Sequence, residues 1–229
     1  MGDIVDDTFR KLRLNSPAGG LFPALQCFSW GITESNIPYA DLFFSPYLKE
    51  VTISPSPLWI RTRAPRHIVP AIASTISALP VTTLQSLYLT YTVHWADLEE
   101  SLSSVAVRCG PSLTEFVSPI PLSGAAINHL IHLPHLRIWR LEGSPPSYSN
   151  LPLPTTFPPL TELALGRGPK RGWLSLFKYL EGGAPPGRHI TPSSRVKESL
   201  THLEFGNSPG LAINLSFTST IQIFRSLTS

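Results

Sequence analysis

Apolar residues recur along the chain in short rows that begin with leucine and continue three and five positions later. The stretch LPHLRIWRL shows the pattern with Leu136, Trp139 and Leu141, and a proline stands two residues before the leucine. Composition predicts roughly one chance match or fewer to this proline-led row, whereas the sequence contains four, so the rows form a repeat. Complete rows begin at Leu25, Leu48, Leu84, Leu136, Leu160 and Leu200, and an imperfect seventh begins at Leu113 and has Ser118 at its sixth position.

Each row predicts a short strand, and the segments between rows change to helical spacing. Positions 4 and 6 of a row differ by two, so their side chains leave the same face of an extended strand. Between rows, apolar residues step by three and four, as on one face of a helix. These helical patterns cover 68–79, 95–105, 127–131, 174–177 and 223–227, and Ser123 and the run 218–220 suit helix N-caps.

The first leucines are 23, 36, 29, 23, 24 and 40 residues apart, and repeats of 20–29 residues are typical of leucine-rich-repeat proteins. We therefore predict an α/β leucine-rich-repeat solenoid, an irregular horseshoe arc with parallel strands inside and helices outside. Residues 1–20 form an N-terminal lead-in or partial cap. Residues 21–229 form one domain of about seven units, with proline-, glycine- and serine-rich insertions at 144–156 and 181–195.

The rows, together with CGPSLTEF (109–116) and KESLTHLEF (197–205), resemble the leucine-rich-repeat region of F-box-type proteins from mushroom-forming fungi. The resemblance covers roughly residues 21–229. It implies a protein-interaction module, the substrate-recognition region of an F-box-like ubiquitin-ligase adaptor. The F-box itself has no room before Leu25, so a Skp-type adaptor is an expected partner only if a missing F-box lies upstream.

Composition narrows the class of protein further. The chain is 42% hydrophobic and 14% charged, and its 24 prolines keep regular elements short. The formal charge of +3 is spread along the sequence, which favours neither a nucleic-acid nor a membrane partner. Two cysteines, the lack of an apolar leader after Met1 and the lack of a long apolar run predict an intracellular protein, cytoplasmic or nuclear.

Two segments carry candidate chemistry, and both have a simpler structural interpretation. The segment 129–135 (HLIHLPH) places three histidines close together, but zinc sites use about four ligands and no cysteine pair accompanies them. The basic loop 166–172 could meet an anion, although it lacks the G-K-[ST] ending of a P-loop. With no G-x-S-x-G motif either, we expect a non-enzymatic protein without cofactor or metal. The alternatives are a metal-binding or enzymatic protein that uses the 129–135 cluster, or a fragment without function of its own.

The remaining candidate is the face of the predicted sheet that lies away from its core. Because side chains alternate along a strand, positions 3, 5 and 7 should project from this face. Glutamates at position 3 in three rows would make it mildly acidic, and Tyr88 and Arg140 are the expected anchors because tyrosine and arginine dominate interface energies. The candidate protein-binding residues are Glu50, Thr52, Ser86, Tyr88, Thr90, Glu115, Ile138, Arg140, Glu142, Glu162, His202 and Glu204.

Overall fold

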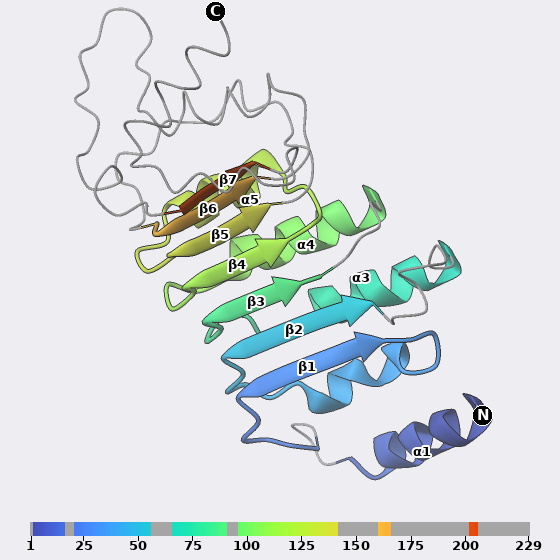
Figure 1. The fold of residues 1–229 in the computed structure, drawn as a ribbon. Coiled ribbons are helices and arrows are strands. Elements are labelled where there is room, and N and C mark those ends of the chain that lie inside the picture. Colours follow the sequence, from blue (N-terminus) through green and yellow to red (C-terminus); the bar gives the residue numbers. More distant parts are fainter. Residues whose placement is uncertain are drawn as a thin grey trace, which may run out of the picture.

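In the computed structural model the chain is an α/β protein built on one open sheet (Figure 1). The structure describes residues 2–16, 21–55, 66–90, 96–141, 160–165 and 202–205. Seven strands pair in parallel and in sequence order, so each connection leads to the adjacent strand. The strands are β1 (Cys27–Ile32), β2 (Glu50–Pro55), β3 (Ser86–Leu89), β4 (Glu115–Ser118), β5 (Ile138–Leu141), β6 (Glu162–Leu165) and β7 (His202–Phe205).

The helices between strands lie on one face of the sheet, where α3, α4 and α5 stand side by side behind the strands (Figure 1). They are η1 (Ile37–Phe43), η2 (Arg66–Ile68), α3 (Val69–Ser77), α4 (Ala96–Arg108) and α5 (Gly124–Ile131). The predicted N-cap is confirmed, because the Ser123 hydroxyl accepts a hydrogen bond from the Ala126 N–H. The helices predicted at 174–177 and 223–227, and the cap at 218–220, lie outside the described residues.

The rows identified in the sequence pair with one another in register, which confirms the predicted strands. All seven residues at position 4 form one continuous ladder, which runs Phe28, Val51, Leu87, Phe116, Trp139, Leu163 and Leu203. A forked hydrogen bond recurs at the start of the strands. The backbone carbonyl at position 2 accepts the N–H groups of positions 2 and 3 of the next row, at 2.7 to 3.0 Å. The carbonyls that do so belong to Gln26, Lys49, Gln85, Thr114 and Arg137.

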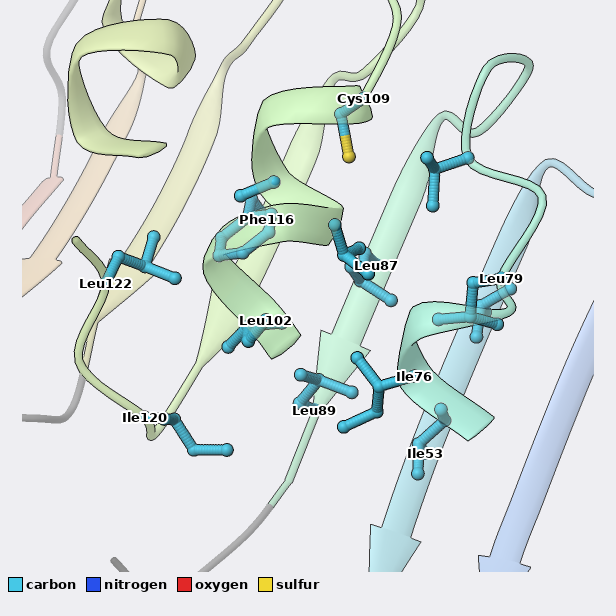
Figure 2. Packing of buried hydrophobic residues seen from close by; sticks show 14 of the residues in the cluster. Ile53, Ile76, Leu79, Leu87, Leu89, Leu102, Cys109, Phe116, Ile120 and Leu122 are labelled. Carbon is cyan, nitrogen blue, oxygen red and sulfur yellow. The ribbon is translucent and has the colours of Figure 1, made fainter. Parts of the chain in front are cut away.

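The core lies between the sheet and its helices, and the first leucines of five rows are among its most buried parts, whereas Leu25 in the first row is half-buried. Leu48, Leu84, Leu113 and Leu136 are fully buried, and Leu160 is nearly so. Strand and helix side chains interleave along the layer, as Leu87 and Phe116 do with Ile76 and Leu102 (Figure 2). Since burying one such aliphatic side chain contributes about 1.5–3 kcal/mol, the shared layer provides the main stabilisation of the fold.

The imperfect row keeps its place because its polar residue is satisfied locally. Ser118 is fully buried at position 6, and its hydroxyl donates to the Ile120 carbonyl at 3.1 Å and accepts from the Ile120 N–H at 3.0 Å. Ile120 and Leu122 are themselves fully buried in the same layer (Figure 2). A buried serine is tolerated here because its hydroxyl both donates and accepts a hydrogen bond within one turn.

Side-chain hydroxyls also join the loops that lead into neighbouring strands. Ser45 donates to the carbonyl of Pro23 at 2.6 Å, and Thr83 donates to the carbonyl of Pro46 at 3.0 Å. One unit further, the Ser112 hydroxyl lies 3.2 Å from the carbonyl of Leu84. We call these contacts the loop staples. They add side-chain bonds between consecutive units at the edge where the strands begin.

Two elements near the N-terminus were not predicted, namely η1 and the helix α1 (Gly2–Leu14). The predicted lead-in at 1–20 is therefore largely helical in its described part. The missed signal in α1 is its charge order, with acidic residues early and Lys11 and Arg13 in the last turn, which complements the helix dipole. Lys11 also lies 2.6 Å from Asp7, one helical turn before it.

Candidate functional site: the open face of the sheet

Positions 3 and 5 of the rows lie on the face of the sheet opposite α3, α4 and α5, and we call this the open face. The alternation of side chains along each strand places them there, because positions 4 and 6 enter the core. The pairing aligns position 3 as Cys27, Glu50, Ser86, Glu115, Ile138, Glu162 and His202. It aligns position 5 as Ser29, Thr52, Tyr88, Val117, Arg140, Ala164 and Glu204.

The middle of the open face combines apolar, aromatic and basic side chains. Val117 pairs with Tyr88 on one side and Arg140 on the other, so these three residues are neighbours along position 5. Adjacent strands are about 4.8 Å apart, which places the Tyr88 and Arg140 backbones about 10 Å from one another. Val117 is only 8% exposed, and Tyr88 and Ile138 are half-buried. We call Tyr88, Val117, Ile138 and Arg140 the central patch.

Sequence reasoning had not identified Val117. Val117 belongs to the imperfect row that begins at Leu113. Its place at position 5 of that row was the signal that would have assigned it to the open face. An apolar residue at this position is shielded by its larger neighbours yet remains part of the same face.

Arg140 is held in place by a neighbouring strand. Its Nε–H donates to the carboxylate of Glu162, which lies on β6 and whose side chain is 16% exposed, against 47% for Arg140. The pairing uses one of the three glutamates expected to make the face acidic. Arg140 is consequently an oriented group on the face, and Glu50 and Glu115 remain the acidic side chains of position 3 in the described sheet.

Ser86 was predicted to contribute to the binding surface, and the structure shows that its side chain is buried, with 8% exposure. It pairs with Glu50 on one side and Glu115 on the other, both of which have longer side chains. A short serine between two glutamates presents little area to a partner. Glu142 lies outside the described residues, and for His202 and Glu204 the structure describes only their place in β7. Thr52 is half-buried and Thr90 is exposed at the end of β3.

A free thiol marks the edge of the open face on β1. Cys27 is exposed and pairs with Glu50 across the first two strands. Desolvation against the sheet, then the negative charge of Glu50 and a hydrogen bond to its carboxylate, raise the pKa of the Cys27 thiol. The thiolate is the reactive form of cysteine, so this environment lowers the reactivity of Cys27 at neutral pH.

The histidines at 129–135 have separate roles in the structure. Because a carbonyl only accepts, the His129 Nε2–H donates to the carbonyl of Cys109 at 2.9 Å, which links α5 to the end of α4. The His132 Nδ1–H donates to the carbonyl of Asn128 at 2.6 Å, and His135 is exposed. Within the described ranges, no three His, Cys, Asp or Glu side chains gather as metal ligands. The basic loop 166–172 and both predicted insertions lie outside those ranges.

Comparison with protein-family models, curated proteins and solved structures gave no significant match to this chain. Among the described helices, none has the length and apolar character needed to cross a bilayer. Functional inference therefore rests on the geometry of the open face.

Proposed function

We propose that the chain is a leucine-rich-repeat solenoid, with residues 21–229 as its repeat domain. Three features support this class of fold. Every row supplies one strand, consecutive rows are adjacent in the sheet, and the forked hydrogen bond recurs from row to row. The described helices that connect the strands lie on one face, whereas doubly wound α/β folds have helices on both faces.

We further propose that the protein is a non-enzymatic interaction module whose partner binds the open face. The observation that carries this proposal is the central patch, where a tyrosine and an oriented arginine flank the nearly buried Val117, with the half-buried Ile138 on the same face of a hydrogen-bonded sheet. Tyrosine and arginine are, with tryptophan, enriched at the energetic centre of protein interfaces. A rigid sheet presents them with little loss of conformational entropy on binding.

The resemblance to F-box-type proteins extends the proposal to substrate recognition for a ubiquitin ligase in the cytoplasm or nucleus. In that role the open face would hold the protein to be modified, and a Skp-type adaptor would require an F-box upstream. The face itself performs no chemical step.

The test is an affinity purification from cells that express the protein, followed by quantitative mass spectrometry of the recovered partners. It compares the native chain with two variants. A variant with Tyr88→Ala and Arg140→Ala should recover the specific partner at least about tenfold less efficiently, since truncating a residue at the energetic centre of an interface costs about 2 kcal/mol or more. Val107→Ala is the matched control, because Val107 is an exposed apolar residue on α4, on the helical side of the sheet. It should leave recovery unchanged.

Stability must be measured on the same variants. Removing Arg140 leaves Glu162 without this ion pair, and a partly exposed pair of this kind contributes at most about 1 kcal/mol. The double variant should therefore remain folded by circular dichroism and melt within a few degrees of the native chain. If the folded double variant captures the same partners as the native chain, the open face is not the binding surface.

A further inference from the structure

Among the described side chains of the first helix, one aromatic residue contacts three rings of the rest of the fold. The Phe9 ring stacks on Tyr39 with centroids 5.3 Å apart, and meets Trp30 and Phe43 edge-on at 6.1 and 6.2 Å. Trp30 comes from β1, whereas Tyr39 and Phe43 belong to η1. These three rings and the carboxylate of Asp41 form a seat at the β1 end of the molecule, which we call the cap notch.

A charged contact lies one helical turn further along α1. The guanidinium of Arg13 donates to both carboxylate oxygens of Asp41, at 2.5 and 2.7 Å, and lies 5.6 Å from the centroid of Tyr39. Residues 9 and 13 are four apart, so both side chains leave the same face of α1. The notch therefore receives an aromatic ring and a guanidinium at a fixed helical spacing.

The other described side chains of α1 lie largely in solvent. From Asp7 to Leu14, every side chain except Phe9 is exposed, and Leu14 is 80% exposed. The Arg13–Asp41 pair is also about half exposed on both sides, so it orients the helix more than it secures it. An isolated helix of this length is marginal in water, so α1 depends on the notch for its order.

We propose that α1 is a cap that opens independently of the core, and that the cap notch is a binding site for an amphipathic helix. The helix it accepts carries an aromatic residue followed four positions later by arginine. Charge complementarity with Asp41 and the ring seat of Tyr39 define this occupant, and α1 fills the site within the same chain. This site lies at the β1 end of the sheet and is separate from the central patch of the open face.

Hydrogen exchange on the native full-length chain tests whether the cap opens separately. The amides of α1 should exchange at least about a hundredfold faster than those of α4, whose Leu102 and Val105 are fully buried, because local opening needs less free energy than global unfolding. Equal protection of the two helices would show that α1 belongs to the core unit and would overturn the proposal. This measurement requires no substitution.

Binding in trans tests the specificity of the notch. A fluorescein-labelled peptide of residues 2–16 should bind the full-length Phe9→Ala variant at least about tenfold more tightly than the native chain, whose own α1 occupies the site. The same peptide with Phe9→Ala should not bind, and Asp41→Asn in the protein should weaken binding several-fold. Leu14→Ala is the control substitution, because this exposed residue should leave the native cap closed. Equal anisotropy changes with the native, Phe9→Ala and Asp41→Asn chains would refute a specific helix site.

Discussion

Gly110 lies against the backbone of Thr82 in the preceding unit, and replacing it with alanine should destabilise the protein. A Cβ atom at this position would stand 2.3 Å from the backbone oxygen of Thr82 and 3.2 Å from its carbonyl carbon. The first distance is shorter than a Cβ atom tolerates and the second is tight, and both neighbouring atoms belong to the main chain. No rotation of a side chain can therefore relieve the clash.

The loop around Thr82 is held by several contacts, which sets the size of the effect. The hydroxyl of the next residue, Thr83, donates to the carbonyls of Pro46 and Leu48, each at 3.0 Å. Moving this loop away from Gly110 would break bonds to the preceding unit. Overpacking in a well-packed region costs about 1–3 kcal/mol, and we expect Gly110→Ala to fall in the upper half of that range.

Thermal unfolding followed by circular dichroism measures the effect. A loss of about 2–3 kcal/mol corresponds to a fall in Tm of roughly 4–12 °C for a chain of this size. Gly31→Ala is the matched control, because no atom lies within 4 Å of a Cβ built there. At such a site the substitution should be neutral or stabilising by about 0.4–1 kcal/mol, since alanine restricts the unfolded chain. If the two variants melt at the same temperature, a Cβ atom at position 110 does not destabilise the fold, and the reasoning from the close approach to Thr82 is refuted.

Three further predictions concern the cysteines and a helix cap. Burial raises the pKa of Cys109 from 9.0 to about 12, so Ellman's reagent should label Cys27 in the native protein and Cys109 only after unfolding. Because unfolded Cys109 ionises first, the unfolding free energy should fall from pH 9 towards 12 by up to about 1.4 kcal/mol per pH unit, relative to Cys109→Ala. Parallel pH profiles for the two proteins would contradict this. Glu50→Gln should lower the pKa of Cys27, so its alkylation by iodoacetamide at pH 8 should accelerate several-fold; an unchanged rate would exclude the influence of Glu50. Ser123→Ala should reduce stability to urea by about 1 kcal/mol through loss of the α5 cap, and an unchanged midpoint would argue against the cap.

The strands could be predicted from sequence because one spacing recurs often enough to exceed chance. The leucine marks the start of each row, and the apolar residues three and five positions later specify the buried face of a strand. The structure pairs these rows in register. The helix α1 was missed because it precedes the rows, although its charge order, with acidic residues early and Lys11 and Arg13 in the last turn, was a local signal for a helix. What local pattern could not show is that Phe9 contacts rings that are remote in sequence.

The candidate surface could be predicted only in outline. Strand alternation identified which residues face away from the core, but it did not show how far neighbouring side chains cover each of them from solvent. Ser86 is consequently buried although it lies on the predicted face, and Val117 belongs to the central patch although it was overlooked. The pairing of Arg140 with Glu162 crosses two strands at different positions of the row, and such diagonal contacts require the register to be known.

The forked hydrogen bonds and the loop staples both lie at the edge where the strands begin. The segments that leave the other ends of the strands can therefore differ in length from unit to unit. Leucines that start successive rows are 23 residues apart in one unit and 36 in the next, yet β1, β2 and β3 keep the same alignment. Residues added between a strand and the following helix therefore leave the spacing of the strands intact. A chain built in this way can acquire new connecting segments while the geometry presented to a partner stays constant.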